Sequence, residues 1–191
     1  MSSPTLETWI SVDVETSGPT LSTGSLLAIG GCLLDDPTTG IELLLKPDPE
    51  RPWRDDAAAI HGLDRDALTR DGLEPAAAAA ALDAWLASVV PVASRPVFVG
   101  LNAGFDWPFV ADLLWRHLGR NPFGPSSLDI KSLYLGRHLA DGLAWRDTAR
   151  VRIREHYPVD LPHTHGALDD AREQAALVRA ILGAARAGDR A

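Results

Sequence analysis

Apolar and polar residues alternate from residue 9 to residue 15, in the segment WISVDVE. Successive side chains of a strand leave opposite faces, so this pattern predicts a half-buried strand that ends on two acidic residues. One face would carry Ile10, Val12 and Val14. The other face would carry Trp9, Ser11, Asp13 and Glu15. The sequence Ser17-Gly18-Pro19 directly after the strand is typical of a turn.

Two further apolar runs, at 25–34 and 40–46, are separated by Asp36-Pro37 and Gly40, which are turn-forming residues. Three consecutive strands joined by short links predict an antiparallel meander. The stretch 47–74 contains Pro47, Pro49, Pro52 and Gly62, and we expect it to be irregular.

The pattern changes to a helical period in the rest of the chain. Apolar residues recur at helical spacing in 75–90, 105–118 and 166–184, and the alanine run 76–81 favours the first of these helices. Short apolar runs at 95–100 and 128–130 predict strands, and the tail 185–191 should fray. Strands followed by alternating strands and helices predict an α/β fold with a mixed sheet, in one domain spanning 1–191 with a core at about 9–182.

The composition is that of a globular protein, with 191 residues, 46% hydrophobic and 23% charged. No apolar run is long enough to span a bilayer and no secretory signal is visible, so we expect no membrane association and a cytoplasmic location. The single cysteine, Cys32, should be a buried thiol. The net charge of −8 argues against a protein that coats nucleic acid by charge alone, but it does not exclude a nucleic-acid enzyme.

Asp13 and Glu15 lie two residues apart, so both side chains leave the same face at the end of a buried strand. Adjacent carboxylates repel each other there unless a cation binds them, and an all-oxygen ligand set suits Mg²⁺ or Mn²⁺. The alternative is a frayed strand end with solvated acids. Asp106 lies near a helix start, where its charge could instead stabilise the helix by interacting with the helix dipole. Asn102 could be a turn residue.

His165 precedes the last predicted helix, and four residues separate it from Asp170. A loop histidine and a helical carboxylate can converge on one site, and a histidine that titrates near neutrality suits the removal of a proton from water. His163 competes for this role, but only His165 has the stated spacing to Asp170.

Together, the motifs VDVETSG (12–18), NAGFDWPF (102–109) and HGALDDA (165–171) resemble the DEDDh (DnaQ-like) 3′→5′ exonuclease superfamily, which includes the proofreading epsilon subunit, oligoribonuclease and ribonuclease T. The stretch 59–68, AIHGLDRDAL, is also similar to a segment of these proteins. Leu101, where many relatives have histidine, and Ser17, which replaces a common threonine, leave the subfamily open.

The resemblance implies a ribonuclease H-like fold with a five-stranded mixed sheet flanked by helices. It also implies cleavage with two metal ions, Mg²⁺ or Mn²⁺. Carried over by motif, the metal ligands would be Asp13, Glu15, Asp106 and Asp170, and His165 would be the general base.

Other residues are candidates for contact with the substrate. The turn Thr16-Ser17-Gly18 could let backbone groups approach the terminal sugar, with Asn102 nearby. Phe105, Trp107 and Phe109 could stack on a terminal base, although Phe109 also suits the core. If 144–155 is a helix, Arg146, Arg150 and Arg154 form one basic stripe, which is either a phosphate contact or a solvated face.

We therefore expect a metal-dependent 3′→5′ exonuclease that releases nucleoside 5′-monophosphates from single-stranded RNA or DNA with a free 3′ end. One alternative is a proofreading subunit that acts beside a polymerase, although a polymerase-binding tail would usually follow the exonuclease domain. Another is a non-catalytic nucleotide- or RNA-binding module on the same fold. A homodimer is compatible with the sequence. The sequence does not distinguish an RNA substrate from a DNA substrate.

Overall fold

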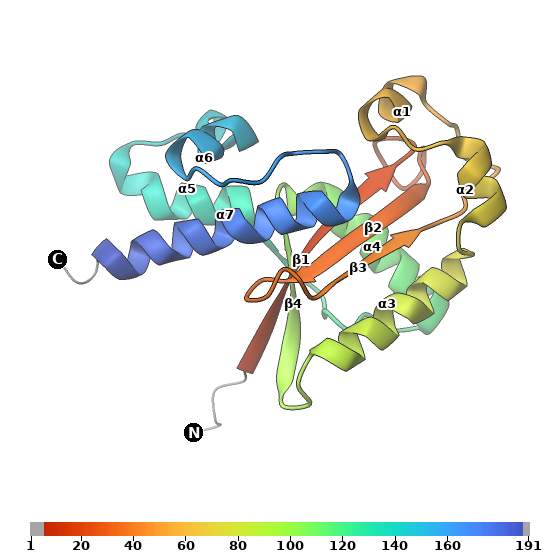
Figure 1. Cartoon of the computed structure of the whole chain (residues 1–191), viewed down its shortest axis with the longest axis horizontal. Coiled ribbons are helices and arrows are strands. Elements are labelled where there is room, and N and C mark those ends of the chain that lie inside the picture. Colours follow the sequence, from red (N-terminus) through yellow and green to blue (C-terminus); the bar gives the residue numbers. More distant parts are fainter. Residues whose placement is uncertain (1–5, 189–191) are drawn as a thin grey trace.

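In the computed structural model, which describes residues 6–188, five strands form one mixed sheet in the order β3-β2-β1-β4-β5 (Figure 1). The first three pair antiparallel, whereas β4 pairs parallel with β1 and β5 pairs parallel with β4. This confirms the predicted meander and mixed sheet. The strands are β1 (Leu6–Thr16), β2 (Leu26–Leu33), β3 (Gly40–Leu44), β4 (Ser94–Gly100) and β5 (Ser127–Asp129).

Helices cover both faces of this sheet (Figure 1). The α-helices are α1 (Asp55–His61), α2 (Arg65–Asp71), α3 (Pro75–Val89), α4 (Ala103–Leu118), α5 (Ile130–His138), α6 (Arg150–His156) and α7 (Ala167–Gly188). Helices α3 and α4 pack on the face of β1 that carries Ile10, Val12 and Val14, as the alternation predicts. Helices α5, α6 and α7 enclose a second apolar cluster on the opposite face, where Cys32 is buried. None of the helices within residues 6–188 has the length and apolarity to cross a membrane.

Glycine at position 30 allows α7 to lie directly on β2. A Cβ atom at Gly30 would stand 2.0 Å from the carbonyl carbon of Ala167 and 2.2 Å from the nitrogen of Leu168, which are the first residues of α7. Gly30 is also the register partner of Asp13 on β1. This close approach therefore places the first turn of α7 over the acidic end of β1.

The stretch 47–74 is irregular as expected up to residue 54, but the expectation was wrong beyond it, where α1 and α2 form. Its three prolines all precede α1, and Gly62 ends that helix with a φ of 66°, a backbone conformation that suits glycine. Asp64 then caps α2 by accepting a hydrogen bond from the backbone N–H of Ala67 at 2.8 Å. Both helices have only seven residues, too few to show a helical period in the sequence.

The segment 144–155 is not one helix either. A 3₁₀ turn, η2 (Trp145–Thr148), is separated from α6 by Ala149, whose backbone is extended (φ −61°, ψ 143°). Arg146 therefore does not share a helical face with Arg150 and Arg154. Helix α5 was not expected, and another 3₁₀ turn, η1 (Leu139–Asp141), follows it. Helix α7 continues to Gly188, and the last three residues of the tail predicted to fray lie outside the described range.

Candidate active site

The four acids expected from the motifs lie around one cleft. Asp13 and Glu15 come from the end of β1, and Asp106 and Asp170 come from the first turns of α4 and α7. All four line a cleft of about 200 Å³. Oxygen atoms of Asp13, Glu15 and Asp170 lie within 4.8 Å of one another, close enough to share a cation.

The acids are held where ionisation is unfavourable. Burial, together with the charges of Asp106 and Asp170, holds the pKa of Asp13 well above its ordinary value. Burial and the charges of Asp170 and Asp106 raise the pKa of Glu15 to about 8, and burial raises the pKa of Asp106 to about 7. A divalent cation would offset this repulsion, and the oxygen-only ligand set fits Mg²⁺ or Mn²⁺.

Hydrogen bonds from three segments fix the orientation of these carboxylates. The backbone N–H of Val14 donates to Asp106 Oδ1 at 3.2 Å, and that of Thr164 donates to Asp170 Oδ1 at 3.0 Å. The buried side chain of Gln174 donates from Nε2 to Asp13 Oδ1 at 2.5 Å. Its Oε1 accepts a hydrogen bond from the N–H of Leu101 at 2.9 Å.

Sequence reasoning missed Gln174, although a signal was present. It lies four residues after Asp170, on the face of α7 that also carries buried Ala171 and Val178. A polar residue at that spacing on an apolar helix face points into the protein, where it needs partners.

Both candidate histidines line the cleft, together with Asn102. His163 Nδ1 lies 2.7 Å from Asp170 Oδ2 and also contacts Arg150, so it can donate to the carboxylate or accept from the guanidinium, but not both at once. The exposed ring of His165 has its centroid 4.1 Å from that of His163, and its backbone has a φ of 58°. The fold therefore brings both histidines to the acids.

The arginines do not form the expected stripe. Arg150 lines the cleft, with Nη1 2.7 Å from Glu173 Oε2 and 3.9 Å from Asp170 Oδ2. Arg154 turns inward to Glu173 Oε1 at 2.7 Å. Arg146 is exposed on η2 and is not among the residues that line the cleft. Arg150 and Arg154 do not form a solvated face either, because both donate hydrogen bonds to Glu173, which is completely buried between them. Sequence reasoning missed Glu173.

A second cavity, of about 310 Å³, adjoins the acidic cleft and shares Val14, Glu15 and Phe105 with it. It is also lined by Thr16, Gly18, Pro19, Arg54, Asp56, Ala57, Ile60 and His61. Within the described residues, the buried Nε2 of His61 has no hydrogen-bond partner, and His61 is one of the residues that line this largely apolar cavity. Sequence reasoning assigned no role to Ile60 or His61, although both lie in the noted segment 59–68.

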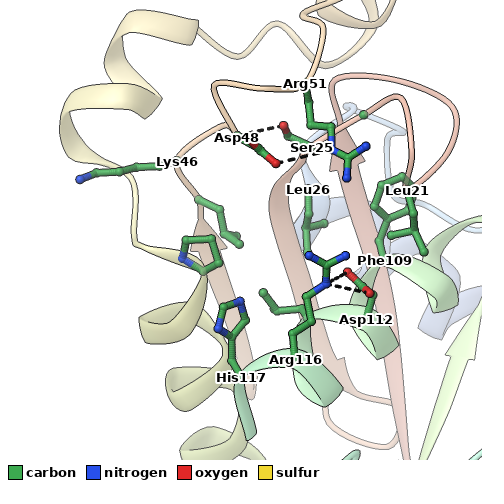
Figure 2. A pocket seen from close by; sticks show the side chains of 14 residues that line it. Leu21, Ser25, Leu26, Lys46, Asp48, Arg51, Phe109, Asp112, Arg116 and His117 are labelled. Atoms are coloured by element: carbon green, nitrogen blue, oxygen red, sulfur yellow. Dashed lines mark hydrogen bonds and ion pairs between the residues drawn. The ribbon is translucent and has the colours of Figure 1, made fainter. Parts of the chain in front are cut away.

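Three other candidates have structural partners. The Ser17 hydroxyl donates to the carbonyl of Pro52 and accepts from the N–H of Ser25. Trp107 packs edge-on against Phe98 with ring centroids 5.1 Å apart, so its ring belongs to the core. Phe109 is also buried, and it borders a third cavity of about 130 Å³ that Leu21 and Ser25 also line (Figure 2).

Both arginines that line the third cavity are paired with acids. Arg51 and Arg116 reach its middle from opposite sides in Figure 2, but each has an acidic partner. Arg51 lies 3.5 Å from Asp48, and Arg116 lies 2.9 Å from Asp112. Three aromatic side chains were predicted to stack on a base: Phe105, Trp107 and Phe109. Of these, Phe105 is the one that lines the acidic cleft.

The β3-β2-β1-β4-β5 sheet and the convergence of four acids with histidine define the class as a ribonuclease H-like nuclease of the DEDDh type. The comparisons agree. The chain is 41% identical over 175 residues to the 3′-5′ DNA exonuclease Cap18 of Escherichia coli, a match that covers 92% of this chain and 91% of that protein. The chain therefore belongs to the DEDDh 3′-5′ exonuclease superfamily, and it is a 3′-5′ exonuclease.

Solved structures show the same fold. The nuclease domain of 3′hExo, a DEDDh family member bound to rAMP, is 13% identical and superposes with a TM-score of 0.72 over 94% of this chain and 93% of that one. E. coli exonuclease I in complex with a dT13 oligonucleotide is 18% identical, with a TM-score of 0.69 over 96% of this chain. The chain spans only 43% of that exonuclease I chain. No family model matches the sequence.

Proposed function

We propose that this protein is a divalent-metal-dependent exonuclease that releases nucleoside 5′-monophosphates from the 3′ end of single-stranded DNA. The observation that carries this proposal is the set of four carboxylates around one cleft, of which Asp13, Glu15 and Asp106 have raised pKa values. The similarity to a 3′-5′ DNA exonuclease favours DNA over RNA as the substrate. The exonuclease I complex with dT13 is consistent with a single strand.

The four acids would hold two Mg²⁺ or Mn²⁺ ions. When bound, such ions bind the scissile phosphate, acidify the attacking water and stabilise the leaving 3′ oxygen. Asp13 and Asp170 come from different elements and offer oxygens close together, so both can bind one ion. Hydrogen bonds to Gln174 and to the backbone of Thr164 keep these two carboxylates in place before a metal arrives.

His165 would accept the proton of the attacking water. Its ring is exposed at the edge of the cleft, where water has access, and histidine is the side chain most often used as a general base. His163, beside it, is engaged by Asp170 and would orient that carboxylate. Arg150 lines the same cleft and would contact a substrate phosphate while Glu173 holds its other side.

The terminal nucleotide would enter the cavity that adjoins the acids. Phe105 and Ile60 would offer an apolar surface for the base. His61, whose Nε2 has no hydrogen-bond partner among the described residues, lines the same cavity. Thr16 and Gly18 line the same cavity, close to where the sugar would lie. An unpaired 3′ end reaches this cavity without the cost of opening a base pair.

The experiment is a time course on matched single-stranded DNA and RNA oligonucleotides with Mg²⁺, with Mn²⁺ or with EDTA. We expect DNA to be shortened from its 3′ end, with release of 5′-monophosphates, only when metal is present. Glu15→Gln, which preserves side-chain shape, is the inactive control. Undiminished turnover in EDTA would refute the metal-dependent mechanism. Faster cleavage of RNA would overturn the choice of substrate, and binding without turnover would identify a non-catalytic module.

A further inference from the structure

The two histidines lie on a segment without regular secondary structure. Residues 157–166 connect α6 to α7 and contain neither helix nor strand; we call them the histidine segment. A segment of this kind has no repeating backbone hydrogen bonds to hold it, so specific side-chain contacts must fix its position. Those contacts determine where His163 and His165 lie relative to the acids.

Glu173 provides the buried end of such a contact. It lies on α7 almost one turn after Asp170, and its side chain is completely buried. A buried carboxylate is costly unless it is paired and hydrogen-bonded. Arg150 Nη1 donates to Oε2 and Arg154 Nη1 donates to Oε1, each at 2.7 Å. Glu173 therefore ties α6 to the helix that carries Asp170.

Arg154 extends this connection to the histidine segment. Its Nη2 donates to the carbonyl oxygen of Leu161 at 3.0 Å and lies 3.4 Å from that of Val159. One guanidinium thus joins three pieces: helix α6, the Glu173 carboxylate on α7 and the middle of the histidine segment. The planar fork of arginine can serve both partners at once, which the single ammonium of lysine does less well.

The two ends of the histidine segment are held separately. At its start, the hydroxyl of Tyr157 lies 2.7 Å from His138 Nε2, and His138 Nδ1 lies 2.8 Å from Asp141. Near its end, the N–H of Thr164 donates to Asp170. Within residues 6–188, Arg154 is the side chain that hydrogen-bonds to the carbonyls of Val159 and Leu161, just before His163, whose own ring contacts Asp170 and Arg150.

We propose that Glu173 and Arg154 form a clamp that positions the histidine segment, and with it the general base, over the acidic cleft. Both are positioning residues, because neither lines the acidic cleft. Arg154 acts through the histidine segment, and Glu173 acts through Arg154 and also holds Arg150. This inference rests on the proposed function, in which His165 accepts the water proton. Small misplacements of a catalytic group lower the rate of the chemical step, so the clamp should affect kcat more than KM.

The test compares Arg154→Met with Arg152→Met. Arg152 lies on the same short helix, but it is exposed and pairs with exposed Glu155, so it is a matched control. With a single-stranded DNA substrate, we expect Arg154→Met to lower kcat by about 10- to 100-fold and to change KM by less than about twofold. Hydrogen exchange should become faster in residues 157–166. Arg152→Met should match wild type in both measurements.

A double-mutant cycle separates positioning from general loss of structure. If Arg154 acts through the base, Arg154→Met should cost much less in a His165→Ala background than in wild type. Equal losses in the two backgrounds would overturn the clamp, as would wild-type kcat and exchange in Arg154→Met. If Arg154→Met fails to fold, Arg154→Lys is measured in the same way, with a smaller loss expected.

The outcome is distinguishable from failure of the proposed function. Wild-type protein without metal-dependent turnover would refute the proposed function, while hydrogen exchange in Arg154→Met would still test the clamp. Mg²⁺ binding, measured by calorimetry, should be unchanged in Arg154→Met because the four acids remain in place. A large loss of Mg²⁺ affinity would overturn the clamp by showing that Arg154 supports the acids instead of the histidine segment.

Discussion

Asp13, Glu15 and Asp106 illustrate how a functional requirement opposes stability at single residues. In the unfolded chain these acids ionise near their ordinary pKa values of 3.8 to 4.5. In the folded protein burial raises the pKa of Asp106 to about 7 and that of Glu15 to about 8. At a pH between the ordinary and the raised pKa of a carboxyl group, the folded state binds more protons than the unfolded state. The free energy of unfolding therefore decreases as pH rises through this range.

We therefore predict that the metal-free protein becomes less stable as pH rises from about 7.5 to about 9, a window that lies above the ordinary His61 pKa of 6.5 and includes the raised pKa of Glu15, about 8. Burial lowers the pKa of His61, so it opposes this trend only at lower pH. The melting temperature in EDTA should decrease across this window, and Mg²⁺ should raise it most at the alkaline end.

Asp13→Asn is the control for this trend. Asparagine keeps an oxygen for the Gln174 contact but carries no charge. The variant should flatten the pH dependence and be as stable as wild type or slightly more stable in EDTA, while activity is lost. A large drop in its melting temperature would instead make Asp13 a structural partner.

The histidine pair allows a second prediction at this scale. His165→Ala should lose about two to four orders of magnitude in kcat, the usual contribution of general-base catalysis. His163→Ala should be mild by comparison, because it removes an orienting contact to Asp170 and leaves the exposed base in place. Steady-state kinetics on one DNA substrate compares the two variants, and a reversed order would assign the base to His163.

The residues of the site were predictable to different degrees. The acids and His165, which the structure brings to one cleft, could be singled out because strand alternation and helix starts place them in recognisable motifs, and their roles stay predictions. Glu173 and Gln174 were missed because a glutamate and a glutamine on a long helix usually face solvent. Their burial depends on how α7 packs against β1, β4 and α6, which local sequence does not reveal.

At the scale of elements, long periodic segments were predicted well and short ones were not. The alternation in β1 and the apolar stripes of α3, α4 and α7 extend over enough residues to define a period. Helices α1, α2 and α6 have seven residues each, and their ends depend on capping. The break at Ala149 was missed because the residues of the segment 144–155 are compatible with a continuous helix.

The contact between β2 and α7 gives a prediction for elements. Gly30→Ala would force a Cβ atom against the backbone at the start of α7. Backbone atoms cannot rotate away from this contact as a side chain would. We expect a loss of about 3 kcal/mol in stability and a fall in activity as Asp170 is displaced from Asp13. Gly31→Ala is the matched control, because its Cβ would meet its nearest atom at 3.5 Å, an ordinary contact. Urea unfolding of both variants measures the difference, and equal stability would refute this account of Gly30.

At the scale of the molecule, the active site exists only because the sheet gathers distant segments. The hydrogen bond from Val14 to Asp106 spans 92 positions in the sequence, and that from Gln174 to Asp13 spans 161. The order of the motifs predicted this convergence through the family resemblance. The inward turn of Arg150 and Arg154 towards Glu173 was not predictable in this way, and it changes how much positive charge is available to a substrate.

That charge distribution predicts how the enzyme moves along its substrate. The protein has a net charge of −8, and Glu173 neutralises part of the expected basic stripe. Few phosphate contacts imply weak retention between cuts and a shallow dependence of affinity on salt. We therefore expect distributive degradation of single-stranded DNA with a free 3′ hydroxyl.

On a 5′-labelled strand of about 20 nucleotides, intermediates of every length should appear early, because each release competes with the next cut. A blocked 3′ end should stop the reaction, whereas a blocked 5′ end should not, because the terminal nucleotide must enter the cavity beside Glu15 and Phe105. Excess unlabelled strand added after the start should halt shortening of the labelled strand. Complete digestion of some molecules while others stay intact would show a processive enzyme, and cutting of a circular strand would show an endonuclease.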